Sequence, residues 1–416
     1  MAVQAFVWIW LPGQTEPVVA GRIFRDGQRL SFNYGRSYLA RGDAIPLYLP
    51  ELPLVSGAIT PLPGLSMPSS LRDAAPDAWG RRVILNRLLG RQARDVDVDR
   101  IDELSYLLES GSDRIGALDF QASATDYVPR AAIGATLDEL IQSAARVEAG
   151  IQLTPELDRA LHHGSSLGGA RPKALLTDGA TKYVAKFPAA GDVHDVVKAE
   201  YVAMRLAAEA GLDVAPVRLV QAQGKDVLLV ERFDRVAVGE DWARRAMVSA
   251  LTLLELDEMM ARYASYEVLA EIIRHRFAAP RETLRELFGR LVFNILCGNT
   301  DDHARNHAAF WDGASLSLTP AYDICPQARA GGEAGQAMLI HGARRDSRLA
   351  LCLDAADAFL LTREAADAII DRQIAIIGAR YDAVCDEAGL SAVGRDLMRG
   401  RQFLNPYVLQ DYRGAY

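Results

Sequence analysis

The chain has 416 residues, of which 50% are hydrophobic and 24% are charged, with a formal net charge of −8. This length exceeds that of one ordinary hydrophobic core and predicts two or three lobes. The composition is that of a globular protein and excludes a disordered one. The negative net charge argues against a protein that coats nucleic acid through bulk electrostatics.

Secretion and membrane insertion are not expected. The first ten residues lack a cationic lead and reach Pro12 after a short apolar run, so they predict a strand rather than a signal peptide. The chain contains no run of about 18 apolar residues, the length a membrane-spanning helix needs. The cysteines show no Cys-x-x-Cys pair, which fits a reducing cytoplasm and gives neither a disulfide framework nor a zinc framework. They are Cys297, Cys325, Cys352 and Cys385.

The N-terminal region is predicted to be small and rich in β-structure. Residues 18–24 and 30–34 flank Asp26-Gly27, which favours a tight hairpin. The prolines of residues 46–68 remove backbone donors and predict irregular chain.

Three helix starts follow along the chain. We expect one helix from Asp77 to Leu89. Thr136 and Glu139 have the spacing of a capping box, which predicts a second start. Thr154 followed by a proline predicts a third.

A glycine-rich segment over residues 164–173 precedes two predicted strands, 174–177 and 181–187, and Lys186 lies near the end of the second strand. A helix is expected over 195–210, ending at a C-capping glycine, and then a hairpin over 217–230.

Beyond residues 231–234 the pattern is predicted to turn helical, and the sequence through Tyr416 is expected to be mostly helical. Apolar residues recur at three and four positions between Leu284 and Ile295, which predicts one buried helix face. That helix is expected to end at Gly298 and to lead into Asn299–His307, followed by a hairpin around residues 312–313.

The most informative motif is Asp301 followed by Asn306, with Asp323 one hairpin later. Phosphoryl transfer uses a carboxylate near the attacking hydroxyl, then an amide and a second carboxylate for magnesium. We therefore assign Asp301 as the catalytic base or substrate-orienting acid, and Asn306 and Asp323 as magnesium ligands. A register shift that gives this role to Asp302 stays open.

Upstream residues occur in the order a kinase requires. A strand lysine such as Lys186 pairs with phosphate oxygens, and Glu200 on the next helix is expected to hold it there. The glycine-rich segment, including Gly168, Gly169 and Ala170, suits backbone contacts to phosphates, although it is not a Walker A loop.

Two further features carry predictions about the nucleotide. Phosphorylation of Ser165 or Ser166 would place negative charge on the phosphate-binding segment and repel nucleotide. Residues 231–234 follow a strand, so Glu231 and Phe233 are expected to offer backbone groups to adenine, and the carboxylate of Asp234 to reach a ribose hydroxyl.

Two rival interpretations compete at the Asp301 motif. His303 and His307 would share one face of a helix, with Asp302 nearby, and so suggest a transition-metal site, but a general-base glutamate of the His-Glu-x-x-His kind is missing. The motif also suits a polar loop that caps a helix.

Together these motifs resemble the HipA family of bacterial serine/threonine kinase toxins over most of the chain. The segments that carry the resemblance are Ser165–Lys173, Val184–Pro188, Val230–Asp234, Asn299–Asn306 and Tyr322–Asp323, with Asp77–Arg81 and the Asp26–Gly27 hairpin in the N-terminal region.

The resemblance implies that Lys186 positions the phosphates of ATP, that Glu231 and Phe233 hold adenine, and that Asp234 contacts the ribose. It implies catalysis by Asp301, with Mg²⁺ on Asn306 and Asp323. It also implies inhibitory autophosphorylation at Ser166, with Ser165 beside it as the alternative.

The family's usual partner is a HipB-like helix-turn-helix antitoxin, through which operator DNA is bound. Its known substrates are aminoacyl-tRNA synthetases, glutamyl-tRNA synthetase foremost, whose phosphorylation halts translation and promotes growth arrest and persistence. The resemblance thus implies a cytoplasmic protein with a protein substrate and no membrane partner.

The expected fold is α/β (α+β) in the manner of a protein kinase. We expect a β-rich N-terminal subdomain over residues 1–125, an N-lobe over 126–233 and a helical C-lobe over 234–416, with an ATP cleft between the lobes. Two alternatives remain: a small-molecule kinase of the aminoglycoside or choline type, and a non-catalytic co-repressor that only binds an antitoxin.

Overall fold

The computed structural model describes residues 2–90, 96–98, 101–130, 135–161, 169–192, 194–329 and 331–413. Within these residues the chain forms two compact units. The first unit comprises Met1–Gly191, Val220–Val248 and Phe310–Ala314, and the second comprises Asp192–Leu219, Ser249–Ala309 and Ser315–Tyr416.

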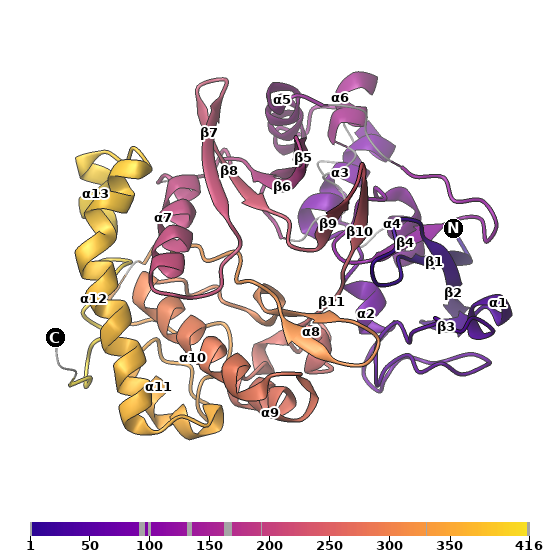
Figure 1. Ribbon diagram of the computed structural model, residues 1–416. Helices are drawn as coiled ribbons and strands as arrows, with labels where there is room; N and C mark the ends of the chain where they lie inside the picture. The colour runs from indigo at the N-terminus through magenta and orange to yellow at the C-terminus, as the bar shows by residue number, and fades with distance from the viewer. Residues whose placement is uncertain are drawn as a thin grey trace. The chain divides into compact units, whose positions relative to one another are not determined.

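The first unit begins with a four-stranded sheet in the order β3-β2-β1-β4 (Figure 1). Its strands are β1 (Gln4–Ile9), β2 (Val18–Asp26), β3 (Arg29–Tyr34) and β4 (Leu118–Gln121). The predicted hairpin is confirmed, but Asp26 pairs with Arg29, so the two turn residues are Gly27 and Gln28. Gly27 has a φ of 61°, a left-handed conformation that glycine adopts without steric cost.

Short helices and irregular chain cover this sheet. The helices are α1 (Arg36–Leu39), α2 (Ser69–Arg72) and α4 (Glu103–Glu109). Residues 46–68 contain neither a helix nor an extended strand, as their prolines predict. A single core cluster joins strand and helix side chains, among them Val7, Ile23, Phe32, Leu104 and Phe120.

Three further helices of the first unit begin where the sequence predicts. In α3 (Ala78–Leu89) the Asp77 side chain accepts a hydrogen bond from the backbone N–H of Gly80. In α5 (Leu137–Glu148) Thr136 and Glu139 form the complete capping box. The third helix is α6 (Pro155–Leu161).

A second four-stranded sheet has the order β5-β6-β8-β7. It consists of β5 (Lys173–Asp178), β6 (Thr181–Lys186), β7 (Val217–Ala222) and β8 (Lys225–Glu231), so the two predicted hairpins are present. Apolar side chains of the α3, α5 and α6 helices form one core with inward-facing residues of β5, β6 and β8.

One prediction about secondary structure is wrong. The segment after Asp234 is not helical but forms β9 (Arg235–Val238), β10 (Asp241–Arg244) and β11 (Ala246–Ser249), and the next helix is α8 (Ala250–Leu253). The β9 and β10 strands pair in antiparallel register, from Val238 opposite Asp241 to Arg235 opposite Arg244. The β-branched residues Val236 and Val238, followed by Gly239 with a φ of 63° that suits a tight turn, favour this ribbon.

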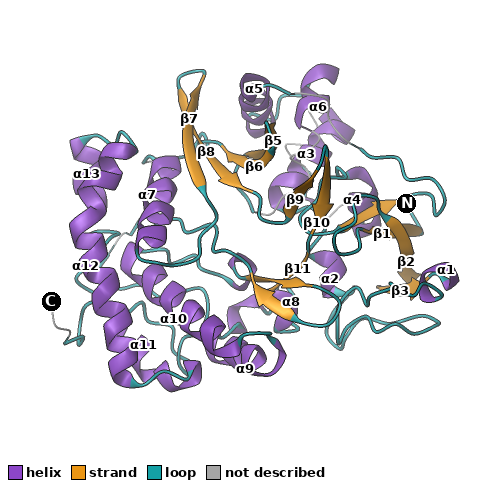
Figure 2. Ribbon diagram, in the orientation of Figure 1, coloured by secondary structure: helices purple, strands orange, loops and turns teal. Residues whose placement is uncertain are grey.

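The second unit is rich in helices (Figure 2). The α7 helix packs against α12, and α10 packs against α9, α11 and α12. These helices are α7 (Val196–Glu209), α9 (Tyr266–Arg276), α10 (Pro280–Cys297), α11 (Leu349–Asp354), α12 (Arg363–Glu387) and α13 (Ala392–Met398). Short 3₁₀ turns occur at Ala261–Tyr263, Ala304–Asn306 and Ala356–Phe359, and the predicted hairpin is β12 (Ala308–Trp311) with β13 (Leu316–Leu318).

All four cysteines are free thiols with buried side chains, as expected for a chain without a disulfide framework. Among the described residues, no helix combines the length and the apolar character needed to cross a membrane.

Candidate functional site

The described site residues predicted from the sequence fall into two sets, one in each unit. The first unit carries Gly169, Ala170, Lys186, Glu231, Phe233 and Asp234. The second carries Glu200, Asp301, Asn306 and Asp323. The remaining predicted residues, Ser165, Ser166 and Gly168, lie outside the described residues. The meeting of the two sets, including the pairing of Lys186 with Glu200, stays a prediction.

The loop that carries Asp301 is set by the end of α10. Gly298 caps this helix in the left-handed conformation, with a φ of 73°. A Cβ atom at Gly298 would lie 2.8 Å from the backbone oxygen of Gln402, so no larger residue fits without a shift of the backbone. The N–H of Asn299 then donates to the carbonyl of Asn294 at 2.8 Å, which closes the helix and starts the loop.

The two neighbouring acids of this loop have different environments. Asp301 is exposed, whereas Asp302 is only 2% exposed. The Tyr266 hydroxyl donates to the carboxylate of Asp302, and His307 Nε2 lies 3.0 Å from Asp302 Oδ1. Burial, followed by the charge of Asp302, raises the pKa of Tyr266 well above its usual value, so this hydroxyl keeps its proton. Asp302 is thus engaged in an internal network, whereas Asp301 is the exposed acid of the pair.

Hydrogen bonds join the segment that carries Asp323 to the Asp301 loop. The Tyr322 hydroxyl donates to the carbonyl of Arg305 at 2.7 Å, and Asn299 Nδ2 donates to the carbonyl of Asp323 at 3.5 Å. Asp323 has a φ of 58°, a left-handed conformation that non-glycine residues seldom adopt. Such conformations cluster at functional sites, where the surroundings impose them.

Asn306 completes this group of residues. Its side chain is 7% exposed, and its Nδ2 donates to the carbonyl of Asp301 at 3.3 Å. The pKa of the Asp301 carboxyl is raised, chiefly because its surroundings partly screen it from water; the attraction of His303 lowers the pKa, and the repulsion from Asp323 and Asp302 raises it. The second unit therefore gathers two carboxyl groups and one amide around a single loop.

The donor set fits Mg²⁺ better than a transition metal. His303 and His307 flank the 3₁₀ turn Ala304–Asn306 and do not share the face of an α-helix, and His307 is engaged with Asp302. Across the residues that the structure describes, no group of three His, Cys, Asp or Glu side chains is placed to hold a metal ion. Magnesium requires no such group, because one or two protein oxygens together with phosphate oxygens and water complete its coordination.

In the first unit, Lys186 is the last residue of β6 and is half-buried. It lies opposite Lys173 of β5 and opposite Leu228 of β8. Because β6 and β8 are antiparallel, Glu231 lies opposite Tyr183. At the usual rise of a strand, Lys186 and Glu231 are therefore separated by about 10 Å along the sheet.

The described end of the glycine-rich segment is attached to the start of α3. The N–H of Trp79 donates to the carbonyl of Gly169 at 3.3 Å, and its indole Nε1 donates to the carbonyl of Lys173 at 2.9 Å. Gly169 has a φ of +99°, and a Cβ atom there would lie 2.2 Å from Lys173 Nζ. The sequence did not indicate this role for Trp79, because 94 residues separate it from Lys173.

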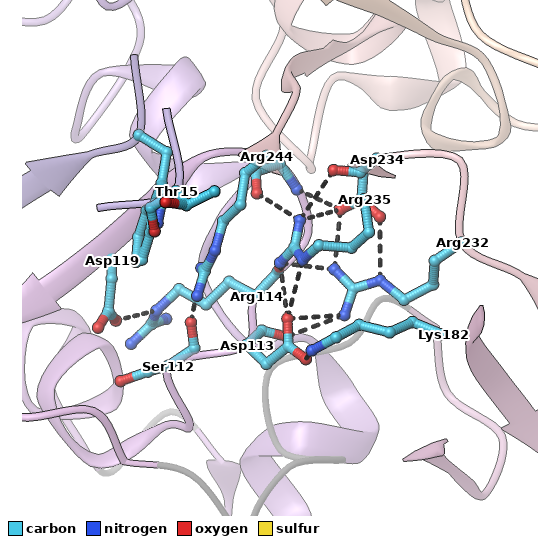
Figure 3. A network of polar contacts seen from close by, with 12 residues as sticks. Thr15, Ser112, Asp113, Arg114, Asp119, Lys182, Arg232, Asp234, Arg235 and Arg244 are labelled. Carbon is cyan, nitrogen blue, oxygen red and sulfur yellow. Dashed lines mark hydrogen bonds and ion pairs between the residues drawn. The ribbon is translucent and has the colours of Figure 1, made fainter. Parts of the chain in front are cut away.

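Asp234 has an environment that we did not predict. It is 2% exposed, and its carboxylate accepts hydrogen bonds from the side chains of Arg232 and Arg235 and from the N–H of Gly116 (Figure 3). Burial raises the pKa of Asp234, but the two arginines outweigh that effect and lower it to about 2. A ribose hydroxyl would have to compete with these donors. The ribose contact stays a prediction, and the structure gives this carboxylate a role inside the first unit.

Curated proteins resemble this chain over different lengths. The candidate kinase Y4mE of Sinorhizobium fredii is 28% identical over 346 residues, which are 76% of this chain and 76% of that protein. The serine/threonine-protein kinase toxin HipA of Shewanella oneidensis is 29% identical over 151 residues, which are 32% of this chain and 34% of that protein.

A solved structure shares the fold. In the complex of Shewanella oneidensis HipA, HipB and operator DNA, the matching chain superimposes with a TM-score of 0.67 at 20% identity, covering 96% of this chain and 99% of that one. The predicted mixed α/β fold of the HipA kinase type is thereby confirmed.

Family models match two consecutive parts of the sequence. The HipA N-terminal domain matches residues 9–121, and the HipA-like C-terminal domain matches residues 165–380. The first match begins at the last residue of β1 and contains β2, β3 and β4, and the second contains Lys186 and the Asp301 loop. The chain belongs to the HipA family.

Proposed function

We propose that this protein is an ATP-dependent serine/threonine protein kinase and the toxin of a HipA/HipB-type toxin–antitoxin module. The observation that carries the proposal is the arrangement of Asp301, Asn306 and Asp323 around one loop, with Asp302 withdrawn into the interior. A phosphoryl-transfer site requires an available acid beside an amide and a second acid.

In this proposal Lys186 binds the phosphates of ATP, and the backbone of Glu231 and Phe233 holds the adenine. Asn306 and Asp323 would hold Mg²⁺, which when bound neutralises charge on the phosphates. The carboxylate of Asp301 orients a serine or threonine hydroxyl and accepts its proton. The hydroxyl oxygen forms a bond to the γ-phosphorus, the bond to the β,γ-bridging oxygen breaks, and ADP leaves.

The proposed partners follow from the family. The Shewanella oneidensis complex contains HipA with HipB and operator DNA, which supports a HipB-like helix-turn-helix antitoxin as the partner of this chain. An aminoacyl-tRNA synthetase, glutamyl-tRNA synthetase foremost, is the proposed substrate, whose phosphorylation in the cytoplasm would arrest growth and promote persistence. Autophosphorylation at Ser166 or Ser165 completes the proposal, and phosphopeptide mapping after incubation with ATP tests it.

The three-part division also stays a proposal. A boundary near residue 125 agrees with the matched N-terminal domain, which ends at residue 121. Limited proteolysis with mass spectrometry would test it, and cleavage concentrated well inside residues 1–125 would count against this boundary.

A lysate experiment tests the main proposal. Bacterial lysate is incubated with γ-labelled ATP and the wild-type protein, the Asp301→Asn variant or the Asp357→Asn variant, which changes an exposed acid elsewhere in the second unit. We expect a labelled protein band with the wild type and with Asp357→Asn, and its loss with Asp301→Asn. Mass spectrometry of the band identifies the substrate and the modified residue.

The same experiment separates the alternatives. Label that appears only in acid-soluble metabolites would favour a small-molecule kinase. Nucleotide binding by the wild type with no transfer to any acceptor would favour a non-catalytic co-repressor. Equal labelling by Asp301→Asn and the wild type would contradict the catalytic assignment.

A further inference from the structure

A buried network of charges joins two distant stretches of the first unit. One is the loop Ser110–Gly116 that precedes β4, and the other is the crossover segment, residues 231–234, together with Arg235 (Figure 3). The side chains of Arg232 and Arg235 are each only 1% exposed. Both guanidinium groups therefore depend on protein partners rather than on water.

Asp113 is the centre of this network. Its carboxylate lies 2.8 Å from Lys182 Nζ, 3.0 Å from Arg232 Nη1 and 2.7 Å from Arg235 Nη2. Burial raises the pKa of Asp113, but the surrounding cations, Arg232 first, outweigh it and hold the pKa well below its ordinary value. Asp113 is therefore ionised at neutral pH and neutralises part of the charge of three cations.

Backbone groups reinforce the same connection in both directions. Arg232 Nη2 donates to the carbonyl of Arg114 at 2.8 Å, and Arg235 Nη1 donates to the carbonyl of Gly116 at 2.9 Å. In return, the N–H of Gly116 donates to Asp234 Oδ2 at 2.8 Å. The crossover segment is thus hydrogen-bonded to the loop Ser110–Gly116 through both side chains and backbone.

The network also reaches the strand that carries Lys186. Lys182 lies four residues before Lys186 on β6, and its carbonyl accepts a hydrogen bond from the N–H of Arg232 at 2.8 Å. Glu231, at the start of the crossover segment, pairs with Tyr183 on the same strand. A single carboxylate therefore contacts both elements to which the proposed function assigns nucleotide binding.

We propose that Asp113 is a positioning residue for the nucleotide: it fixes the crossover segment relative to β6, so that the adenine-binding backbone and Lys186 keep their spacing. This inference rests on the proposed function, because it assigns nucleotide binding to those two elements. It makes the N-terminal region, whose family match ends at residue 121, part of the nucleotide site without touching the nucleotide.

The test compares Asp113→Asn with Glu51→Gln. Glu51 is also a buried acid of the N-terminal region, 3% exposed, but its carboxylate accepts hydrogen bonds from Ser69 and Ser70 and has no contact with the network. ATP binding is measured by calorimetry, and KM and kcat are measured by label transfer, at a temperature at which all proteins are folded.

We expect Asp113→Asn to raise the Kd and KM for ATP about tenfold, roughly the effect of one lost hydrogen bond, with kcat nearly unchanged because the Asp301 loop keeps all its contacts. Hydrogen exchange of residues 231–235 should be faster than in the wild type. Glu51→Gln should lower the unfolding temperature but keep the wild-type KM and the wild-type exchange of these residues.

Lys182→Met is the milder variant if Asp113→Asn does not fold. It removes one of the three cation contacts at a side chain that is 19% exposed, and it should raise KM about threefold, the effect of less than one ordinary hydrogen bond. Wild-type ATP affinity in Asp113→Asn or, if that variant is unfolded, in Lys182→Met would overturn the inference while leaving the proposed function intact. No ATP binding by the wild type would overturn both.

Discussion

Substituting the two adjacent acids of the Asp301 loop one at a time separates chemistry from stability. Asp301→Asn removes an exposed carboxylate, and Asp302→Asn removes a carboxylate that is 2% exposed and engaged with Tyr266 and His307. The two side chains are neighbours in the sequence, so any difference between the variants reports on their environments.

For Asp301→Asn we expect a large loss of rate and almost no loss of stability. A positioned acid or base contributes about 10²–10⁴-fold to the rate of a proton-transfer step, and turnover should fall by this factor. An exposed substitution usually changes the free energy of unfolding by less than about 0.5 kcal/mol. Because the folded state raises the pKa of Asp301, its ionised form at neutral pH opposes folding, and the neutral amide should leave stability unchanged or slightly higher.

For Asp302→Asn we expect a large loss of stability and a smaller loss of rate. The amide oxygen still accepts one hydrogen bond, but the charge that both partners face is lost. Hydrogen bonds to charged groups contribute about 1.5–3 kcal/mol each, so the expected loss in the free energy of unfolding is about 3 kcal/mol. This corresponds to a fall of about 6–12 °C in Tm for a body of roughly 150–250 residues.

Thermal unfolding followed by circular dichroism measures stability, γ-label transfer into lysate protein measures turnover, and calorimetry with ATP reports whether the nucleotide site survives. Asp357→Asn serves as the control for loss of an exposed acid. If Asp302→Asn were as stable as the wild type but inactive, and Asp301→Asn were fully active, the catalytic role would belong to Asp302. The reasoning from burial would then be refuted.

Other substitutions test the first unit. Lys186→Ala should weaken ATP binding at least tenfold, or about 1.4 kcal/mol. Lys225 is an exposed lysine of the same sheet, so Lys225→Ala should bind ATP with wild-type affinity. Equal ATP affinities of the two variants would contradict the assignment of Lys186. Trp79→Phe removes one indole hydrogen bond beside the glycine-rich segment and should raise the KM for ATP about fivefold, the effect of about 1 kcal/mol. Trp8→Phe removes a similar bond in the N-terminal sheet and should leave KM unchanged. A Trp79→Phe enzyme with wild-type KM would show that Trp79 does not position the glycine-rich segment for ATP. Asp234 has a folded-state pKa of about 2, below its unfolded value, so the stability it contributes is present above about pH 4 and is lost as the pH falls towards 2. The Tm of Asp234→Asn should therefore fall less steeply over this pH range than the Tm of the wild type. Parallel plots of Tm against pH would contradict a stabilising role for the ion pairs of Asp234.

The sequence alone was sufficient for features whose causes are local. The capping box of Thr136, the left-handed glycine that ends α10 and the hairpin glycines each depend on residues within about five positions, and all are present in the structure. The order of the short motifs was also sufficient to indicate the family. The ribbon formed by β9 and β10 was not predicted because each strand has only 4 residues, too few for the spacing of apolar residues to distinguish a strand from a helix.

What only the tertiary structure decided is which charged side chains leave solvent. Nothing in the sequence separates Asp301 from Asp302, because the groups that bury Asp302 come from α9, with Tyr266 36 residues away. Likewise, Asp113 reaches Arg232 across 119 residues of chain. A carboxylate exchanges water for protein donors only when distant segments pack around it, and local spacing contains no information about that packing.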